Sequence, residues 1–250
     1  MLELIILKII LAIIFIAVCV GLIALIIELF NKSNEHKPYG PYERFIKRPL
    51  DAFLATGAII VLSPVLLVTA ILVRIKLGSP VLFTQERPGK DERIFKLYKF
   101  RTMTNQRGAD GTLLPDEVRL TSFGKTLRGS SLDELPELIN IVKGDMAVVG
   151  PRPLIVQYLP WYSEEQHRRH VVRPGLTGYA QAHGRNTVDW DDKFRMDVEY
   201  IEHITFKGDF QIILDTMKAV FKHEGISSET SATMESFVQY CKLKQRKPNR

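Results

Sequence analysis

The sequence predicts a membrane-associated α+β protein. Two long uncharged segments, Ile9 to Ile27 and Ala52 to Val73, come first, and after Gly78 the pattern changes to short alternating runs and apolar residues at helical spacing. This order indicates an N-terminal transmembrane helix, a re-entrant helix-break-helix, and a small, mostly helical domain with a β-hairpin. The expected parts are a transmembrane helix at 1–30, a linker at 31–46, the re-entrant helix at 47–77, a folded domain at 78–225 and a basic tail at 226–250.

The composition limits the partners that the chain can have. Lys and Arg outnumber Asp and Glu by 34 to 28 among 250 residues, and the isoelectric point is near 9.2. That balance suits an acidic partner, which would be an anionic membrane, a nucleic acid or a phosphorylated small molecule. Cys19 lies in an apolar segment and Cys241 in a basic tail, so neither a disulfide framework nor a thiolate metal site is expected.

The segment from Ile9 to Ile27 carries no charge and would form a helix about 28 Å long, close to the hydrocarbon thickness of a bilayer. It is too long for the apolar part of a signal peptide, and no cleavage site of small residues follows it. Basic residues are concentrated after the segment. The positive-inside rule therefore places the following chain in the cytoplasm.

The second uncharged segment has Ser63 and Pro64 at its centre. Proline lacks an N–H and clashes with the carbonyl four residues earlier, that of Ile60, so a helix should bend here. A hydroxyl such as that of Ser63 is placed to bond the freed carbonyl. Both flanks are basic, which places both ends in the cytoplasm and favours re-entry; a transmembrane helix kinked by proline is the alternative.

Beyond Gly78, two alternating runs, Val81 to Gln85 and Ile94 to Arg101, flank a Pro-Gly turn and predict a β-hairpin. A helix is expected to begin at Ser131 and end at Gly144.

A short strand through "MAVVG" should follow, and Ser163 and Gln166 are spaced as a capping box for another helix. Later helices are expected in "DWDDKFRMDVEYIEH" and "DFQIILDTMKAVFKH". The apolar stripe of the last one is either core or a membrane-surface face.

Asp133 and Glu134 allow two interpretations. With Ser131 they fit an S-x-x-E capping box, in which acids of the first turn are structural. A helix N-terminus also attracts anions, so an ionised Asp beside a Glu would suit a nucleophile or a Mg²⁺ ligand at a phosphate site.

Basic residues suited to the same phosphate lie nearby in the sequence. Arginine binds phosphate through two hydrogen bonds from its planar fork. Arg128 precedes Asp133, and Arg152 is fixed between two prolines, although a surface turn explains that arginine equally well. Lys99 and Arg101 in the second hairpin strand either contact nucleotide phosphates or form the solvated face of the strand.

Two further sets of residues are candidates for binding a ligand. Arg185 and Asn186 fit recognition of a base or sugar, and Gly184 permits a close backbone approach. Lys47 and Arg48 either contact anionic lipid head groups or only signal topology.

Metal-ligating residue types occur elsewhere without completing a site. Asp189, Asp191 and Asp192 resemble a cluster, but a helix cap and first-turn acids explain them better. His167 and His170 lie three residues apart on a helix, and the sequence offers no further ligand beside them.

Five stretches identify a family by resemblance. They are "KRPLDAFLA…LSPVLL", "GSPVLFTQERPG", "FKLYKFRTM", "LTSFGKTLRGSSLDELPELINIVKGDMAVVGPRP" and "RPGLTGYAQAHGRN", in that order. Together they resemble the monotopic polyprenyl-phosphate phosphoglycosyl transferases, the bacterial sugar transferases that initiate glycoconjugate assembly. The resemblance extends from about Phe45 to Gly225.

This resemblance implies a reaction at the cytoplasmic face of the bacterial cytoplasmic membrane. Asp133 would attack the sugar-bearing phosphate of a UDP-sugar and release UMP, and polyprenyl (undecaprenyl) phosphate would then accept the phosphosugar. Glu134 would complete the catalytic pair, Asp133 would bind the required Mg²⁺, and 78–225 would be the catalytic domain. The Ser-Pro segment would be the re-entrant helix of the family.

Some residues depart from the family pattern. Tyr179 and His183 stand where tryptophan and asparagine are common, Glu137 stands where glutamine is common, and the span before residue 30 is additional. These departures bear on the choice of sugar, and the sequence predicts neither the sugar nor the oligomeric state. A non-catalytic, membrane-tethered scaffold is the alternative, but nucleic acid is not expected because aromatic residues do not interleave with the basic ones.

Overall fold

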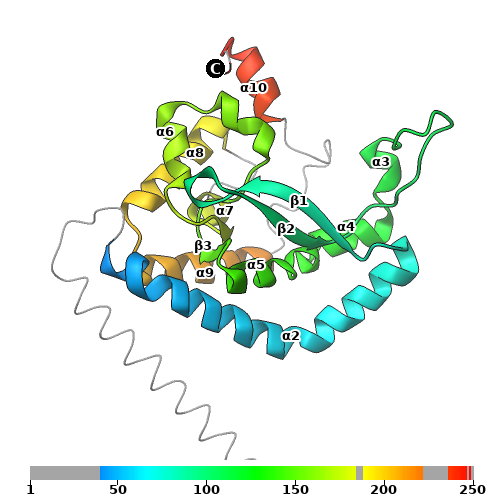
Figure 1. Cartoon of the computed structure of the whole chain (residues 1–250), viewed down its shortest axis with the longest axis horizontal. Coiled ribbons are helices and arrows are strands. Elements are labelled where there is room, and N and C mark those ends of the chain that lie inside the picture. The colour runs from blue at the N-terminus through cyan, green and yellow to red at the C-terminus, as the bar shows by residue number, and fades with distance from the viewer. Residues whose placement is uncertain (1–39, 184–187, 222–235, 247, 249–250) are drawn as a thin grey trace, which may run out of the picture.

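The computed structural model describes residues 40–183, 188–221, 236–246 and 248 (Figure 1). The predicted transmembrane helix at Ile9 to Ile27 lies outside these residues. So do the predicted ligand residues Gly184, Arg185 and Asn186.

The described residues form a mixed structure of helices and small sheets. The α-helices are α2 (Arg48–Leu77), α3 (Asp116–Arg119), α4 (Ser122–Gly129), α5 (Glu137–Lys143), α6 (Glu164–His167), α7 (Tyr179–His183), α8 (Trp190–Glu202), α9 (Phe206–Phe221) and α10 (Phe237–Leu243). The strands are β1 (Leu82–Pro88), β2 (Ile94–Phe100), β3 (Ala147–Val149) and β4 (Gly175–Thr177). The 3₁₀-helices are η2 (Lys90–Glu92), η3 (Leu132–Glu134), η4 (Val156–Trp161) and η5 (Arg168–His170), and η1 (Tyr42–Lys47) is a π-helix.

The long helix α2 bends near its centre and runs beneath the rest of the domain (Figure 1). The predicted hydrogen bond is confirmed, since Ser63 Oγ donates to the Ile60 carbonyl at 2.8 Å. Helical structure continues on both sides of Pro64. The structure therefore has a bend where the sequence predicted a break, because the serine hydroxyl replaces the backbone donor that proline lacks.

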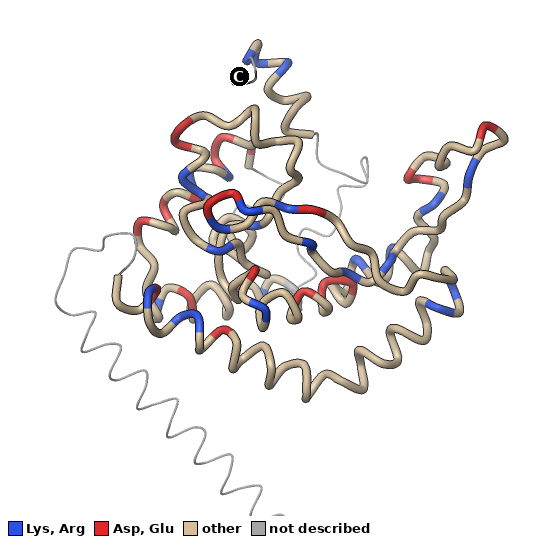
Figure 2. Tube along the Cα trace, viewed as in Figure 1, with Lys and Arg blue, Asp and Glu red and all other residues tan. Residues whose placement is uncertain are grey.

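One helical stretch among the described residues, Tyr42–Leu77, is long and apolar enough to cross a membrane. Its most apolar window has a mean hydropathy of 2.6, and only 11% of that window is buried. Large apolar side chains along α2 are exposed, and Figure 2 shows charge at the two ends of the helix and none between them. An apolar surface of this extent is typical of a membrane contact.

The folded domain holds both ends of this helix. Before α2 begins, buried Lys47 forms an ion pair with Asp209 of α9. At the other end, Arg101 donates to the carbonyls of Leu77 and Ser79, the latter at 2.8 Å. Helix α5 packs along α2 between these two attachments. The domain therefore covers one side of α2 and leaves the other side exposed.

The predicted β-hairpin is confirmed. Strands β1 and β2 are antiparallel, with Leu82 opposite Phe100 and Pro88 opposite Ile94. Buried Asn140 of α5 supports the outer edge of β2: its Oδ1 accepts from the Tyr98 N–H at 3.1 Å, and its Nδ2 donates to the Lys96 carbonyl at 2.8 Å. The asparagine thus supplies hydrogen-bond partners for backbone groups at the edge of the sheet that would otherwise lack them.

The predicted capping box at Ser131 is wrong. Ser131 has φ 56°, its side chain makes no cap hydrogen bond, and the next residues form the turn η3 instead of the first turn of an α-helix. A new helix, α5, begins after Pro136, because the fixed φ of proline suits a helix start. The predicted end is confirmed, since Gly144 adopts φ 94° and caps α5.

The second sheet joins segments from the middle of the chain. The predicted strand in "MAVVG" is confirmed as β3, which pairs in parallel with β4. The capping box of Ser163 and Gln166 is confirmed at α6, and the Asp189 side chain caps α8 by accepting from the Asp192 N–H. Both caps were predictable because their partners lie three residues apart.

The predicted basic tail is wrong for part of its length. Phe237 and Cys241 of α10 are fully buried. Phe237 completes an aromatic cluster with Tyr158, Tyr162 and Trp190. This end of the chain therefore belongs to the core of the domain.

The apolar stripe predicted for α9 coincides with its buried face only in part, since Ile213 packs against the core. The residues of the predicted stripe are Phe210, Ile213, Leu214, Met217, Val220 and Phe221. Asp209 and Ile212 are buried, whereas Phe210 and Met217 are exposed by 54% and 49%. The core interpretation is therefore wrong for Phe210 and Met217, which leaves the membrane-surface alternative as a prediction.

Candidate active site

The turn η3 presents two adjacent carboxylates beside strand β2. It lies between α4 and α5 and packs against both α4 and β2. Asp133 is 8% exposed, and the Glu134 side chain is 20% exposed. Because Ser131 has a left-handed backbone, the two carboxylates lie in a separate turn and not in the first turn of α5.

Glu134 forms ion pairs with two cationic side chains. Its Oε1 accepts from Lys99 Nζ at 2.6 Å and from Arg152 Nη2 at 2.6 Å. Burial works against ionisation, yet the charges and hydrogen bonds of Arg152 and Lys99 lower the pKa of Glu134 to about 2. Glu134 therefore stays ionised and holds both cations in place.

Glu137 shares Lys99 with Glu134, since Lys99 Nζ lies 3.2 Å from its Oε1. Burial is the main reason that the pKa of Glu137 rises to about 7, with Lys99 opposing it and the charge of Glu134 adding to it. This residue departs from the family pattern, and the structure places it directly against the predicted phosphate-binding lysine.

Asp133 differs from its neighbour. Among the described residues, none forms a hydrogen bond or ion pair with its carboxylate. Burial, followed by the charge of Glu134, raises the pKa of Asp133 to about 6, while the charges of Lys99, Arg128 and Arg152 lower it. Asp133 is thus a partly desolvated carboxylate that faces three cations and bonds to none of them.

Arg128 reaches this cluster from α4. Its Nε donates to Thr102 Oγ1 at 3.0 Å. Helix α4 can approach this closely because Gly124 lies against the Thr102 carbonyl, where a Cβ would stand 1.9 Å from the oxygen. The sequence did not predict α4, although its N-cap Thr121, bonded to the Gly124 N–H, is a recognisable local signal.

The structure thus brings Lys99, Arg128 and Arg152 together around Asp133 and Glu134, as the sequence analysis predicted. Arg101 is placed differently. It is buried, and its described hydrogen bonds go to the carbonyls at the end of α2. Its phosphate contact stays a prediction.

Comparison with known proteins gives the family. A sequence model of the bacterial sugar transferase family matches residues 42–223. The chain belongs to this family. The match confirms the predicted family and its enzyme class, phosphoglycosyl transferase, and it covers η3, both hairpin strands and the Pro-Arg-Pro loop.

Relatives of this transferase include two proteins that are named for a phosphotransferase activity towards undecaprenyl phosphate. An uncharacterised sugar transferase, EpsL, of Bacillus subtilis is 48% identical over 77% of this chain and 95% of its own length. An undecaprenyl-phosphate N-acetylgalactosaminephosphotransferase of Aeromonas hydrophila is 36% identical over 72% of this chain. An undecaprenyl-phosphate galactose phosphotransferase of Salmonella typhimurium is 33% identical over 73% of it. The chain spans less than half the length of these last two relatives, 44% and 42%.

Two arginines that the sequence analysis missed position Arg152 in the transferase. Buried Arg169 donates to the Arg152 carbonyl at 2.7 Å and is itself held by Asp197, with Nη2 and Oδ2 2.7 Å apart. Arg87 of β1 donates to the Pro153 carbonyl at 3.2 Å. The sequence offered no signal for these contacts, since the partners lie far apart in the chain.

The two residues predicted to contact head groups differ in the transferase. Lys47 is 3% exposed and paired with Asp209, so the head-group prediction for Lys47 is wrong: a buried, paired ammonium cannot reach lipid. Arg48 is partly exposed and donates to the Val142 carbonyl at 2.8 Å, where it complements the C-terminal end of α5.

A basic cavity of about 490 Å³ opens near the start of α2. It is lined by Glu43, Arg44, Arg48, Lys90 and Arg173. A larger cavity of about 690 Å³ lies between α6, α8 and the C-terminal segment. Neither lining includes Asp133 or Glu134, so the catalytic candidates lie outside both of these cavities.

Proposed function

We propose that this transferase moves a phosphosugar from a UDP-sugar to polyprenyl phosphate, with undecaprenyl phosphate as the acceptor, and releases UMP. The reaction would pass through a covalent phosphosugar intermediate on Asp133. It would supply the first membrane-bound intermediate of exopolysaccharide or glycoconjugate synthesis. The names of the Aeromonas and Salmonella relatives support the acceptor and the group transferred.

The observation that carries this proposal is the contrast between the two carboxylates. Glu134 has its oxygen engaged by Lys99 and Arg152, whereas no described residue bonds to Asp133. A nucleophile needs a free, poorly solvated lone pair close to cations that attract the phosphate. Asp133 meets these conditions, and Glu134 is suited to hold the cations that surround it.

The first step forms a bond between an Asp133 oxygen and the phosphorus that carries the sugar. The bond from that phosphorus to the bridging oxygen breaks, and UMP leaves with its electron pair. In the second step an oxygen of polyprenyl phosphate attacks the same phosphorus, and the Asp133 carboxylate leaves. Two steps allow a water-soluble donor and a lipid acceptor to react one after the other at a single residue.

The basic residues have separate roles in this scheme. Lys99 and Arg152 lie on either side of Glu134 and are placed to neutralise the phosphate as it approaches. Arg128, bonded to Thr102, adds positive charge beside Asp133. Arg169 and Arg87 hold the carbonyls of Arg152 and Pro153, so they fix the backbone that carries the Arg152 side chain.

The same site suits Mg²⁺. This ion prefers oxygen ligands and is usually held by one or two carboxylates together with substrate phosphates. Asp133 offers a carboxylate that no described residue occupies, so it would hold the ion. The ion would neutralise phosphate charge when bound.

We also propose that α2 is re-entrant, so that both of its ends lie on the cytoplasmic face of the bacterial membrane. The helix has 30 residues and an axial length of about 45 Å, enough to cross a bilayer. Yet Asp209 holds the chain before it and Arg101 holds its end, both within one folded domain. A helix that crosses the membrane would carry its two ends to opposite faces. Arg48 and the basic cavity beside it would then face the head groups and the acceptor phosphate.

The central experiment measures UMP and the covalent adduct. Purified full-length protein would receive UDP-sugars one at a time, with Mg²⁺ and undecaprenyl phosphate, and a donor labelled at the sugar-bearing phosphate would report the adduct. Asp133→Asn should abolish both signals, whereas Asp110→Asn, an exposed loop acid, should leave both unchanged. Wild-type UMP release from Asp133→Asn would remove Asp133 as the nucleophile. UMP release without an adduct and without ping-pong kinetics would favour direct transfer.

A labelling experiment tests the topology of α2. Single cysteines would replace Phe45 and Ile75, which are exposed by 66% and 70% at the two ends of the helix. Re-entry predicts that a membrane-impermeant thiol reagent labels both from the cytoplasmic side. Labelling of one position only from the outside would show that α2 crosses the membrane.

A further inference from the structure

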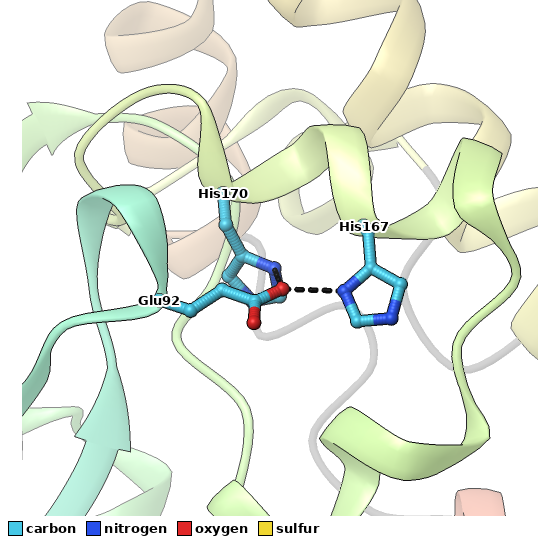
Figure 3. Close-up of side chains that lie close together, drawn as sticks. All are labelled: Glu92, His167 and His170. Atoms are coloured by element: carbon cyan, nitrogen blue, oxygen red, sulfur yellow. Dashed lines mark hydrogen bonds and ion pairs between the residues drawn. The ribbon is translucent and has the colours of Figure 1, made fainter. Parts of the chain in front are cut away.

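A second polar cluster lies at the turn of the hairpin. Glu92 in the turn between β1 and β2 meets His167 at the end of α6 and His170 in η5 (Figure 3). The three possible ligand atoms all lie within 4.8 Å of one another. Glu92 Oε1 contacts His167 Nδ1 and lies 3.5 Å from His170 Nδ1. The carboxylate supplies the additional ligand that the sequence did not reveal beside the two histidines.

His170 gives an independent reason to expect a ligand here. It is 5% exposed, and both of its ring nitrogens are buried and have no hydrogen-bond partner within the part of the chain that the structure describes. Buried polar atoms are rarely left without a partner, and each such case needs an explanation. The ring points towards Glu92 and His167 (Figure 3). A group seated between the three side chains would satisfy one of these nitrogens.

The ligand atoms of this cluster indicate which kind of ion it would bind. Two imidazoles and one carboxylate form a donor set that zinc binds readily, whereas Mg²⁺ prefers oxygen ligands alone. Around a tetrahedral ion at about 2.1 Å from each ligand, the ligand atoms would lie about 3.4 Å apart. The separation of Glu92 Oε1 and His170 Nδ1 is close to this value, whereas Glu92 and His167 are in direct contact and would move apart as an ion binds between them. The nearby guanidinium of Arg169 is neutralised by Asp197, so it does not repel a cation strongly.

We propose that Glu92, His167 and His170 form a binding site for zinc or a similar transition-metal ion, separate from the Mg²⁺ site at Asp133. His167 and Glu92 are 34% and 38% exposed at their side chains, so the ion can enter from solvent. The metal joins the hairpin turn to the α6–η5 segment. Arg169, which holds the Arg152 carbonyl, lies within this segment, so the ion also stabilises the support of Arg152.

The test uses the full-length protein without a polyhistidine tag, stripped with EDTA and kept in excess Mg²⁺. Co²⁺ is titrated in while its visible absorption bands are recorded, and Zn²⁺ is then added to displace it. The variants are Glu92→Gln and His167→Ala, both at partly exposed positions, with His203→Ala as an exposed histidine control and Asp133→Asn to remove the catalytic carboxylate.

The proposal expects one ion per chain in the wild type, in His203→Ala and in Asp133→Asn. Affinity should fall at least about 10-fold in Glu92→Gln and in His167→Ala. Zinc should also raise the unfolding midpoint of the wild type and leave that of Glu92→Gln unchanged. The proposal is overturned by wild-type affinity in both ligand variants, by the lack of a stoichiometric site in the wild type, or by loss of binding in Asp133→Asn.

Discussion

Two buried aspartates serve opposite purposes in this molecule. Asp209 is 4% exposed and accepts hydrogen bonds from Tyr42 at 2.9 Å and Tyr200 at 2.8 Å, together with the ammonium of Lys47. Asp133 is 8% exposed and faces three cations, but no described residue bonds to it. A buried carboxylate whose lone pairs are all used ties parts of a fold together. One whose lone pairs are unused keeps its capacity to react, and the surrounding protein must tolerate its charge.

The largest expected effect separates these roles at Asp133. Asp133→Asn should lower the rate of UMP release on the order of 10⁴-fold or more, because the amide is a poor nucleophile. Its unfolding midpoint, measured without Mg²⁺, should be no lower than that of the wild type, since the change removes a charge that burial disfavours. A large loss of stability in this variant would mean that Asp133 supports the fold.

The reverse pattern is expected at Asp209. Asp209→Asn should lower the free energy of unfolding by about 3–5 kcal/mol, because it leaves the buried ammonium of Lys47 without its counter-charge. Asp215→Asn, on the same helix but in exposed contacts, is the matched control and should leave the free energy of unfolding nearly unchanged. If Asp209→Asn folds normally yet loses UMP release per folded molecule, the two aspartates do not differ as described.

A smaller effect on the rate is expected at Glu134. Glu134→Gln keeps an acceptor for Lys99 and Arg152 but removes the charge that holds them, so kcat should fall on the order of 10²-fold. Initial rates of UMP release at saturating donor would measure this change. A variant with an unchanged kcat and a raised KM would show that Glu134 only aids donor binding.

The smallest predicted effect comes from a single hydroxyl. The Tyr200 hydroxyl donates to Asp209 at 2.8 Å and lies 3.1 Å from the Val149 carbonyl, so it joins α8, α9 and β3. Tyr200→Phe should lower the free energy of unfolding by about 1 kcal/mol and leave UMP release unchanged. Thermal unfolding in detergent would measure the change. A loss much greater than this would mean that the Asp209 network is strongly cooperative.

Local signals in the sequence predicted local structure well. Ser163 and Gln166 cap α6, Gly144 ends α5, and the Pro-Gly turn lies between the two hairpin strands, because each feature depends on residues only a few positions apart. The same reasoning failed at Ser131. A capping pattern requires extended backbone at the serine, and here Ser131 is left-handed because the chain must turn from α4 towards α5.

Contacts across the chain were not predictable from one sequence. Glu92 meets His167 from 75 positions away, and Arg246 reaches Asp191 at 2.8 Å from the C-terminal segment. Asn140 supports β2 only once α5 lies beside the hairpin. For the candidate site, the family motifs supplied the residues Asp133, Glu134 and Arg152. The different roles of Asp133 and Glu134 could be inferred only once the positions of Lys99 and Arg152 were known.

The burial of Cys241 has a practical consequence for work on topology. Its thiol is enclosed by the aromatic cluster, and Phe237 of the same helix is fully buried as well. A folded molecule therefore shields this native cysteine from bulky maleimide reagents. Reporter cysteines can be introduced along the membrane-facing helix while Cys241 stays in place, and its sudden reactivity would warn that a preparation has begun to unfold.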